Sequence, residues 1–326
     1  MPGDTSGWKL FKLPLIKAAG MNPNLAADSL YDSAKRTDLA MTDRKVLLTG
    51  ATGYIASQLV PTFRECYDLA LLDIKAQDRS GNQVPDVVAA DLTDSNRGNY
   101  AQHFNGVDTV VHLGYQRRRG EPLDHFHDES ANVAMAYNVY RTAYEAGARR
   151  VVIASSNHAA DWYEHALIHD RDMEILDPYT LPLSDNFYGW AKATYEHLGF
   201  LFACGTFGRK LEVVMVRIGA PREINVESFS NDSRGYKRDL GAHISQRDLC
   251  QLFTKAIDTP NIENDHGIPW LVVYGISDNT RAFWSLSSAR KVLGYHPEDD
   301  SEVKYAEDIN RFLTGNTSES SVGRVG

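Results

Sequence analysis

The chain has 326 residues, of which 43% are hydrophobic, so it can build a substantial core in one large domain or two unequal ones. Its 34 Lys and Arg residues against 43 Asp and Glu residues give a net charge of −9, which disfavours general nucleic-acid binding. Three widely spaced cysteines predict neither a disulfide framework nor a cysteine-based zinc site, and a cytoplasmic setting is expected.

The first 42 residues differ from the rest of the chain. Prolines and glycines punctuate them, and lysines interrupt the apolar residues between Trp8 and Ala19. Pro14 interrupts a helix here, and the lysines break up the apolar stretch that a secretory signal needs. We interpret residues 1–42 as an N-terminal extension, with a membrane-surface segment as the alternative. No apolar run is long enough to predict a membrane span.

From Lys45 onward, short apolar runs alternate with helical stretches. Strands are predicted at 46–48, 69–74, 87–92, 107–113, 151–154 and 211–218, and helices at 57–64, 132–146 and 189–202. This alternation indicates right-handed βαβ crossovers and a parallel sheet covered on both faces. The predicted fold is α/β, a Rossmann-type doubly wound parallel sheet.

The pattern changes after Gly219. Residues 43–219 are predicted to form a dinucleotide-binding Rossmann domain that also carries the catalytic groups. The polar, less regular residues 220–314 are predicted to be mostly a substrate-binding portion. The Ser- and Gly-rich end, 315–326, is predicted to be a disordered tail.

A glycine-rich loop, Thr49–Ala56, joins the first predicted strand to the first predicted helix. Gly50 allows a sharp turn, Gly53 lets the backbone approach a pyrophosphate, and Ala56 lets helix and strand pack closely. The helix N-terminus then offers free N–H groups to the phosphates. An ordinary βα turn is the alternative, but the strand–loop–helix context favours a dinucleotide site.

Acidic residues follow the next two predicted strands. Asp73 is placed to bind the adenosine ribose hydroxyls and to repel a 2′-phosphate, which favours NAD over NADP; Lys75 softens that preference. Asp91 and Leu92 are predicted to reach the adenine, although a simple cap at the strand end is equally consistent.

Tyr188 and Lys192 are predicted to be the acid/base pair. At spacing i and i+4 they share one helix face, and a nearby ammonium favours the phenolate of a tyrosine whose ordinary pKa is about 10. Tyr188 can then take a proton from a substrate hydroxyl while hydride leaves to a nicotinamide. The spacing alone is not specific, because Tyr31 and Lys35 share it.

A polar run, Ser155–His158, follows the fifth predicted strand, where ligands bind in open parallel sheets. Ser156 is predicted to hold the substrate oxygen and share its proton with Tyr188, with Ser155 as the alternative. Asn157 and His158 are predicted to contact a polyhydroxylated substrate, against a structural role for the histidine.

Other histidines are given structural roles. His112 interrupts an apolar strand and is read as structural. The run that contains His125, His127, Asp128 and Glu129 is interpreted as a solvated helix start, so no metal site is predicted.

The glycine loop, Asp73, the strand Val110–Leu113, Asn132, Ser156 and the Tyr188/Lys192 pair together resemble the extended short-chain dehydrogenase/reductase family, which includes NAD-dependent sugar epimerases and dehydratases. The resemblance covers residues 45–310. The runs Ala154–His158, Val216–Gly219 and Ser245–Asp248 are similar to uronate dehydrogenases and related aldose dehydrogenases. Val273–Asn279 and Ala289–Tyr295 are similar to haloarchaeal NAD-dependent glucose-6-phosphate dehydrogenases.

The resemblance implies oxidation of the anomeric hydroxyl of a sugar, uronate or sugar phosphate to a lactone. Tyr188 is then the base, Ser156 the oxyanion partner and Lys192 the cofactor clamp. The expected cofactor-binding residues are Gly50, Gly53, Tyr54, Ile55, Asp73, Asp91, Leu92, Leu113 and Lys192. The alternative is an NDP-sugar epimerase or dehydratase with tightly bound NAD; a non-catalytic dinucleotide sensor is disfavoured because both Tyr188 and Lys192 are present. Relatives of this kind commonly dimerise through the Tyr/Lys helix, so a homodimer is expected.

An anionic substrate needs a cation, and arginine suits a carboxylate or a phosphate. The candidates are the cationic residues that follow Val216: Arg217, Arg222, Arg234, Lys237, Arg238 and Arg247. Arg247 is the predicted substrate ligand, with a structural ion pair as the alternative. An insertion that contains His165–Asp172, between Ser156 and Tyr188, is predicted to reshape the rim of the pocket.

Overall fold

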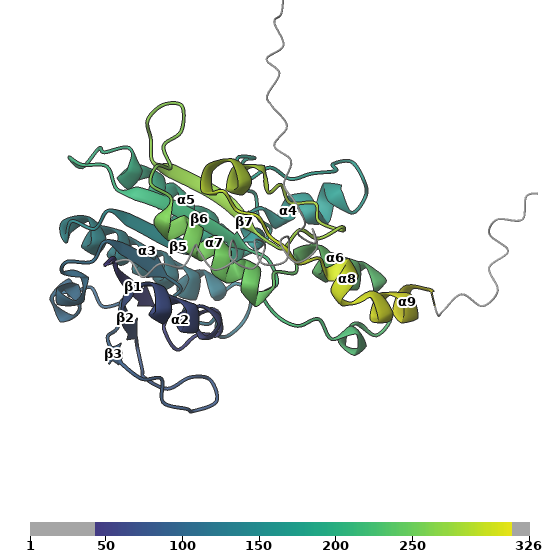
Figure 1. The fold of residues 1–326 in the computed structure, drawn as a ribbon, viewed down its shortest axis with the longest axis horizontal. Coiled ribbons are helices and arrows are strands. Elements are labelled where there is room, and N and C mark those ends of the chain that lie inside the picture. Colours follow the sequence, from purple (N-terminus) through teal and green to yellow (C-terminus); the bar gives the residue numbers. More distant parts are fainter. Residues whose placement is uncertain (1–42, 315–326) are drawn as a thin grey trace, which may run out of the picture. The chain divides into compact units, whose positions relative to one another are not determined.

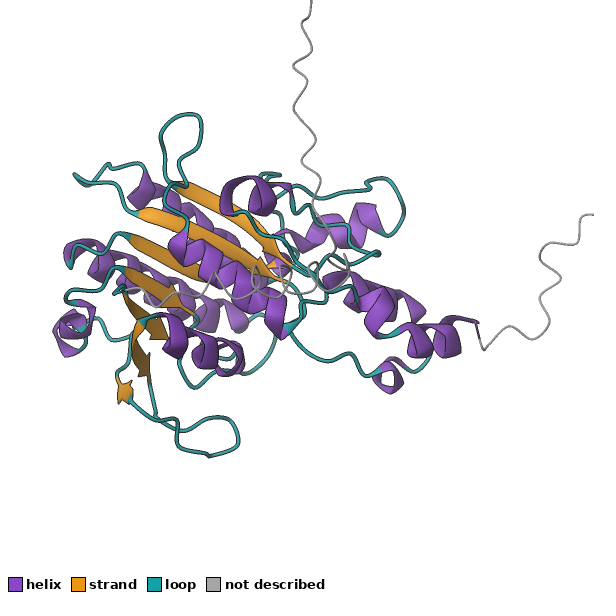
Figure 2. Cartoon of the chain, in the orientation of Figure 1, coloured by secondary structure: helices purple, strands orange, loops and turns teal. Residues whose placement is uncertain are grey.

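A seven-stranded parallel sheet organises residues 43–314, the part of the chain that this computed structural model describes. The order in the sheet is β3-β2-β1-β4-β5-β6-β7, and every neighbouring pair is parallel (Figures 1 and 2). The strands are β1 (Lys45–Thr49), β2 (Asp68–Asp73), β3 (Val87–Ala89), β4 (Thr109–His112), β5 (Arg150–Ser156), β6 (Glu212–Ile218) and β7 (Trp270–Gly275). The predicted extension and the predicted tail lie outside the described residues.

Helices cover both faces of the sheet, as the predicted doubly wound fold requires. On one face α2 (Tyr54–Cys66) and α7 (Gln246–Asp258) bury side chains in the same cluster as Val46 and Leu48 of β1. On the other, α3 (His125–Glu145) and α5 (Phe187–Ala203) pack in a second cluster with Leu47. Successive residues of β1 thus enter opposite cores, which explains its continuous apolar run.

A smaller lobe lies beyond the carboxyl ends of the strands, where Figure 1 shows α6 (Ser233–Ala242), α8 (Ser301–Lys304) and α9 (Ala306–Thr314) together. It has its own apolar cluster, formed by Ile224, Val226, Tyr236, Leu240, Tyr305 and Ile309. The remaining short helices are η1 (Arg97–Asn99), η2 (Ala101–Phe104), η3 (Asn157–Ala160), α4 (Asp161–Tyr163), η4 (Glu164–Ile168), η5 (Val226–Phe229) and η6 (Ala289–Leu293).

The seventh strand is the main feature that the sequence analysis missed. β7 pairs with β6 from Val213 to Ile218, so the sheet extends beyond the predicted boundary at residue 219. Its apolar run had been noted only as part of a family resemblance. Strand β7 pairs with β6 through a long-range contact that local periodicity does not reveal, and five of its six residues are buried.

Several element boundaries also differ from the prediction, and two of them bear on the site. The third strand ends at Ala89 rather than at residue 92, because Asp91 begins a turn in which its carboxylate accepts hydrogen bonds from Thr93. Helix α3 begins at His125, seven residues before the predicted start, within the polar run. None of the helices between residues 43 and 314 is long and apolar enough to cross a membrane.

Candidate active site

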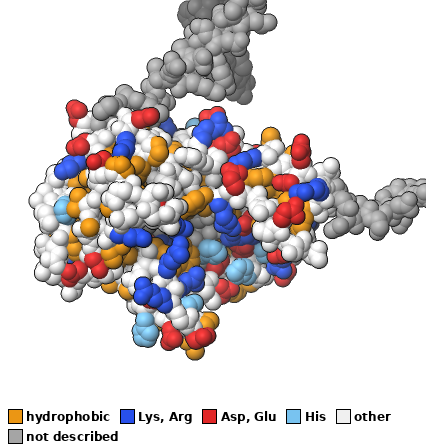
Figure 3. All heavy atoms as spheres, turned by 90° about the horizontal axis from the view of Figure 1, so that it is seen from below, with side chains coloured by type: hydrophobic (Ala, Val, Ile, Leu, Met, Phe, Trp, Pro, Cys, Tyr) orange, Lys and Arg blue, Asp and Glu red, His pale blue; other side chains and the backbone are white. Residues whose placement is uncertain are grey.

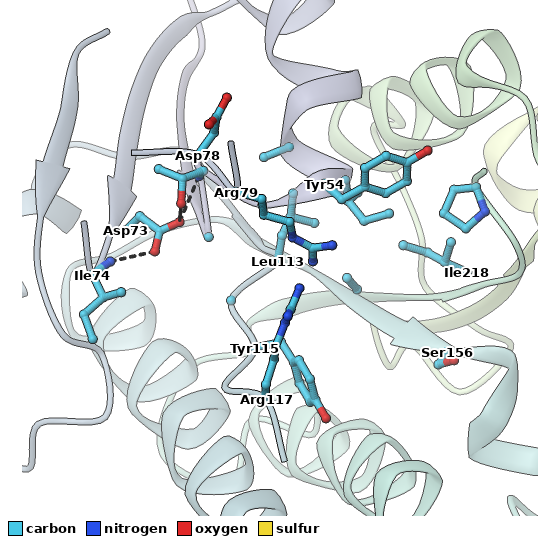
Figure 4. A pocket seen from close by; sticks show the side chains of 18 of the residues that line it. Tyr54, Asp73, Ile74, Asp78, Arg79, Leu113, Tyr115, Arg117, Ser156 and Ile218 are labelled. Carbon is cyan, nitrogen blue, oxygen red and sulfur yellow. Dashed lines mark hydrogen bonds between the residues drawn. The ribbon is translucent and has the colours of Figure 1, made fainter. Parts of the chain in front are cut away.

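A cavity of about 810 Å³ opens at the carboxyl ends of the strands. The turn between β1 and α2, the end of β2, the loop after β4, the end of β5 and the first turns of α5 form its walls. Figure 4 shows Asp73 on one side of this cavity and Ser156 with Ile218 on the other. Parallel strands bring these segments together because all of their carboxyl ends meet at one edge.

The turn after β1 suits a pyrophosphate. Gly50 has φ +73°, and a Cβ added to it would come within 2.6 Å of the backbone N of Gly114, so only glycine fits. Helix α2 begins after Gly53, with no side-chain cap and no acidic residue in its first turn. The free N–H groups of that turn and the positive end of the helix dipole therefore remain available to an anion.

Asp73 is held rigidly at the wall of this cavity. Its carboxylate accepts hydrogen bonds from the backbone N and Oγ1 of Thr52, at 2.8 and 2.7 Å, and from the N of Ile74 at 2.7 Å (Figure 4). A carboxylate has about four acceptor sites, so capacity remains for a ribose hydroxyl. Lys75 and Arg79 line the same part of the cavity. The predicted cofactor residues Gly50, Gly53, Tyr54, Ile55, Asp73, Leu113 and Lys192 all line it.

Tyr188 lies on the first turn of α5 and faces the cavity. The ring of Tyr115 packs edge-on against it at 5.5 Å, and the Lys192 Nζ lies 5.6 Å from its ring centroid. Burial raises the pKa of Tyr188, and a hydrogen bond with Ser156 acts in the opposite direction. The predicted trio of Ser156, Tyr188 and Lys192 is therefore assembled in one place.

Lys192 is buried beneath the cavity floor, where its Nζ donates a hydrogen bond to the carbonyl of Ala154 at 2.9 Å. Burial lowers its pKa from 10.5 to about 8, although the negative charges of Glu129 and Glu196 oppose this shift. The side chain is therefore mainly an ammonium at neutral pH. Its positive charge favours the phenolate of Tyr188.

The two serines at the end of β5 have different partners. Ser155 donates its hydroxyl to the buried carboxylate of Glu196 at 2.8 Å, whereas Ser156 lies beside Tyr188. Ser156 also accepts a hydrogen bond from the backbone N of His158 and donates one to Asn157. Of the two candidates, Ser156 is the one placed to hold a substrate oxygen.

Asn157 and His158 reach the neighbourhood of the site in different ways. The His158 ring lies 5.8 Å from that of Tyr188, and its Nδ1 is hydrogen-bonded to Asp161 at 3.0 Å. Asn157 is buried, and its Nδ2 has no hydrogen-bond partner among residues 43–314. Neither residue belongs to the cavity wall itself.

Sequence reasoning missed Asp161 and Asn186. The Asn186 side chain caps α5 by accepting from the N of Gly189, and it donates to the Asp161 carboxylate at 2.8 Å. Burial raises the pKa of Asp161, but hydrogen bonds from His158, Ser184 and Asn186 outweigh it and lower the pKa. Asn186 carried a readable signal, because Asn just before a helix is a common N-cap.

Glu129 corrects one prediction. It lies in the run interpreted as a solvated helix start, yet its side chain is 0% exposed and accepts a hydrogen bond from the hydroxyl of Tyr115 at 2.8 Å. Asn132, one turn along α3, donates to the same carboxylate and binds the backbone of Gln116. The loop after β4 covers this turn of the helix, and that contact is not visible in the local sequence.

Several predicted ligands are not brought to the cavity. Asp91 caps its own turn and Leu92 is buried beside it, away from the cavity wall. Arg247 lies on α7, 51% exposed, in ion pairs with Glu298 and Asp299. These pairs correspond to the structural alternative considered for Arg247.

Two other cationic candidates, Arg217 and Arg222, already form ion pairs. Arg217 is buried in a bidentate pair with Glu196 and donates to Tyr274, so it lies behind the site rather than in it. Arg222 pairs with Asp239.

His112 is buried in β4, with its Nδ1 2.7 Å from the hydroxyl of Thr49, and burial lowers its pKa to about 3.

One set of potential metal ligands occurs among the described residues. Asp161, His165 and Asp185 have ligand atoms within 4.8 Å of one another. His165 and Asp185 are exposed, and they are hydrogen-bonded to each other at 2.7 Å. The buried Oδ1 of Asp161 has no hydrogen-bond partner among the described residues, whereas its Oδ2 accepts from Asn186.

The fold and this site define a Rossmann enzyme of the short-chain dehydrogenase/reductase type, with a glycine turn after the first strand, a carboxylate at the end of the second strand and a Ser/Tyr/Lys trio. A family model described as "NAD dependent epimerase/dehydratase family" matches residues 46–205. The NAD-dependent glucose-6-phosphate dehydrogenase of Haloferax volcanii is 33% identical over 79% of this chain and 95% of that protein. The uronate dehydrogenase of Pseudomonas syringae is 30% identical over 79% of this chain and 83% of that protein.

The solved structures give the same result. The crystal structure of uronate dehydrogenase from Agrobacterium tumefaciens superposes with a TM-score of 0.61 at 25% identity, over 87% of this chain and 93% of that one. The chain belongs to the NAD-dependent epimerase/dehydratase family, the extended short-chain dehydrogenases/reductases. It is an oxidoreductase, and its cofactor is NAD.

Proposed function

We propose that this protein oxidises the anomeric C1 hydroxyl of a sugar, a uronate or a sugar phosphate to the lactone, with NAD as the hydride acceptor. The observation that carries the proposal is the assembly of Ser156, Tyr188 and Lys192 on one side of the nucleotide cavity. The relatives named glucose-6-phosphate dehydrogenase and uronate dehydrogenase support it, since both act on sugars.

The side chains have separate tasks in this reaction. Ser156 donates a hydrogen bond to the C1 oxygen, and Tyr188 takes the C1 hydroxyl proton. The hydrogen on C1 leaves as a hydride, so C1 becomes the lactone carbonyl, and bound NAD supplies the acceptor. Lys192 holds positive charge beneath the phenol and is placed to bind the nicotinamide ribose.

A panel of sugars tests the proposal. The purified protein with NAD and separate uronates, aldoses and hexose phosphates should form NADH with at least one of them. Conversion of a UDP- or dTDP-sugar without net NADH, and no NADH from any free sugar, would instead establish the epimerase or dehydratase alternative.

Tyr188→Phe tests the assigned base. Removal of the phenolic oxygen should lower kcat by about 10²- to 10⁴-fold, the usual contribution of a general base, with little change in NAD affinity. Tyr179→Phe is a matched control, because this tyrosine is exposed and does not line the cavity. Retention of turnover in Tyr188→Phe would remove Tyr188 from the mechanism.

We also propose that the protein is a homodimer through α3 and α5. These helices pack side by side on one face of the sheet and expose the apolar side chains of Phe126, Tyr137, Trp190 and Leu201. The rings of Phe126 and Trp190 lie 5.6 Å apart, so the two helices share a continuous aromatic surface. A second copy of the same face would remove it from water.

A further inference from the structure

A second cavity, of about 580 Å³, lies between α6, the end of the insertion after β5 and the loop that follows β7. Its lining includes four cationic side chains, Arg234, Lys237, Arg238 and Arg281, together with His169 and Ser233. Within the described part of the chain no Asp or Glu lines it. In a protein of net charge −9, this concentration of positive charge is local. Figure 3 shows Lys and Arg side chains interspersed with Asp and Glu side chains over the face that it draws.

Two of the four cations are already neutralised. Arg238 forms ion pairs with the buried Glu164 and with Asp239, and Arg281 forms a bidentate pair with Glu302. These pairs hold both guanidinium groups in place against the wall of the pocket.

Arg234 and Lys237 are the unneutralised cations. Both are exposed, and neither has a hydrogen bond or an ion pair with any residue from 43 to 314. Burial and then the charge of Arg234 lower the pKa of His169, so Arg234 lies close to that ring. Ser233 begins the ten-residue helix α6, and the carboxylate of Asp232 caps this helix by accepting a hydrogen bond from the N of Gly235 at 2.8 Å, so the positive charge of the pocket comes from its side chains.

The surplus charge matches a phosphate monoester. A phosphate monoester carries a charge of about −1.5 to −2 at pH 7 and offers three strong acceptor oxygens, whereas a carboxylate carries −1. The Nε2 of His169 already lies 3.4 Å from the carboxylate of Glu164, so the two free cations, with the Ser233 hydroxyl beside them, are the groups that suit a phosphate better than the carboxylate of a uronate.

The pocket lies next to the active site. Gly219 and Pro221 line the active-site cavity, and Ala220 between them exchanges backbone hydrogen bonds with the segment Ala242–Ile244 at the end of α6. The proposed ligands lie further along the same helix: Lys237 precedes Ala242 by five residues and Arg234 by eight, which is about 7.5 and 12 Å along a helix. On the opposite side, Asp161 holds His158 beside Tyr188, and Glu164 holds Arg238 one turn later.

We propose that this pocket binds the phosphate of a sugar phosphate whose C1 lies at Tyr188, through Arg234 and Lys237. The assignment rests on the proposed oxidation at C1 and narrows its substrate class to phosphorylated sugars. It also gives the insertion after β5 a role, because that insertion supplies both His169 and the Glu164 that fixes Arg238.

The test compares glucose 6-phosphate with glucose in the wild type and in the double variant Arg234→Gln/Lys237→Gln. Loss of two charge-assisted contacts should raise the KM for glucose 6-phosphate at least about tenfold and leave the kinetics with glucose unchanged. Lys237→Gln alone should give part of the effect. Lys291→Gln is its matched control, since Lys291 is an exposed lysine outside the pocket with no partner among the described residues.

Inhibition by inorganic phosphate distinguishes a pocket that binds the phosphate of the substrate from one that binds phosphate as a separate effector. Competitive inhibition by phosphate against glucose 6-phosphate in the wild type, lost in the double variant, supports the assignment to the substrate. If phosphate instead alters turnover of glucose and glucose 6-phosphate equally, and the double variant keeps its KM for glucose 6-phosphate, the site is for a separate effector and the assignment is overturned.

Titration calorimetry with inorganic phosphate tests the pocket independently of the proposed oxidation. Phosphate binding by the wild type that the double variant loses supports the pocket, even if no sugar yields NADH, which would contradict only the proposed oxidation. A sugar that yields NADH with an unchanged KM ratio in the double variant overturns the pocket and leaves the oxidation standing.

Discussion

At the scale of the residue, we propose that Asp73 sets the choice of cofactor. Its carboxylate is fixed by Thr52 and Ile74, so it cannot turn away from a ribose that carries a 2′-phosphate. Lys75 and Arg79 lie in the same wall of the cavity and have the opposite charge. We therefore expect the preference for NAD over NADP to depend on this carboxylate and on the two cations that line the same cavity.

Asp73→Ala should relax the preference for NAD over NADP, because the 2′-phosphate then meets Lys75 and Arg79 without the opposing carboxylate. The ratio of kcat/KM for the two cofactors measures the change, and at least a tenfold shift towards NADP is expected. Asp68→Asn, at the other end of β2 and exposed, is the matched control. An unchanged ratio in Asp73→Ala would refute the ribose-binding role.

Lys192 predicts a pH dependence of stability. Its pKa is about 8 in the folded protein and about 10.5 when unfolded, so between these values the unfolded chain binds more protons. Stability from this group therefore rises as the pH increases from 8 to 10.5. The full shift corresponds to about 3 kcal/mol.

Lys192→Met should remove this pH-dependent contribution. Below pH 8 the free energy of unfolding of the variant should exceed that of the wild type by its largest amount, and this difference should shrink towards pH 10. Urea unfolding of both proteins across this range measures the difference, which cancels the titration of tyrosines common to both. A difference that does not vary with pH would contradict the lowered pKa.

At the scale of the element, helix α5 is the scaffold of the site. A Cβ at Gly189 would come within 2.0 Å of the carbonyl of His158, so the first turn of α5 packs directly on the polar segment after β5. Asn186 caps this turn and is tied to Asp161. Tyr188, Lys192 and Ser156 are thus placed by one contact between two elements.

Asn186→Ala should cost about 1 kcal/mol of stability through the lost cap and should also lower kcat, because Tyr188 is two residues away. Thermal unfolding and steady-state kinetics measure the two effects. Ser245→Ala is the control: it removes the cap of α7, which does not carry catalytic residues, and should reduce stability without changing kcat. Equal kcat in both variants would show that the cap of α5 is only structural.

At the scale of the whole molecule, the exposed face of α3 and α5 predicts self-association. Leu201→Glu places a charge in the middle of this surface, where the leucine is 48% exposed, and should convert a dimer into a monomer. Sedimentation velocity measures the molecular mass in solution. Val303→Glu, on α8 and away from the face, should leave the mass unchanged. A monomeric wild type would contradict the proposed interface.

Local sequence patterns determined much of this protein. The run Val46–Leu48, the glycine turn and the Tyr188/Lys192 spacing each follow from short-range geometry, so the fold class and a candidate acid/base pair could be predicted without coordinates. Short-range patterns are readable because strand and helix periods place side chains relative to their near neighbours.

The tertiary structure decided what depends on residues far apart in the chain. Strand β7, the buried Glu129 and the pairing of Arg217 with Glu196 all rest on contacts between distant segments. The same holds for the division of the arginines into paired and free groups, which places Arg247 in a surface ion pair and leaves Arg234 and Lys237 to the second pocket. Whether an arginine or lysine is neutralised depends on which carboxylates the fold places beside it, and the amino-acid composition does not contain that information.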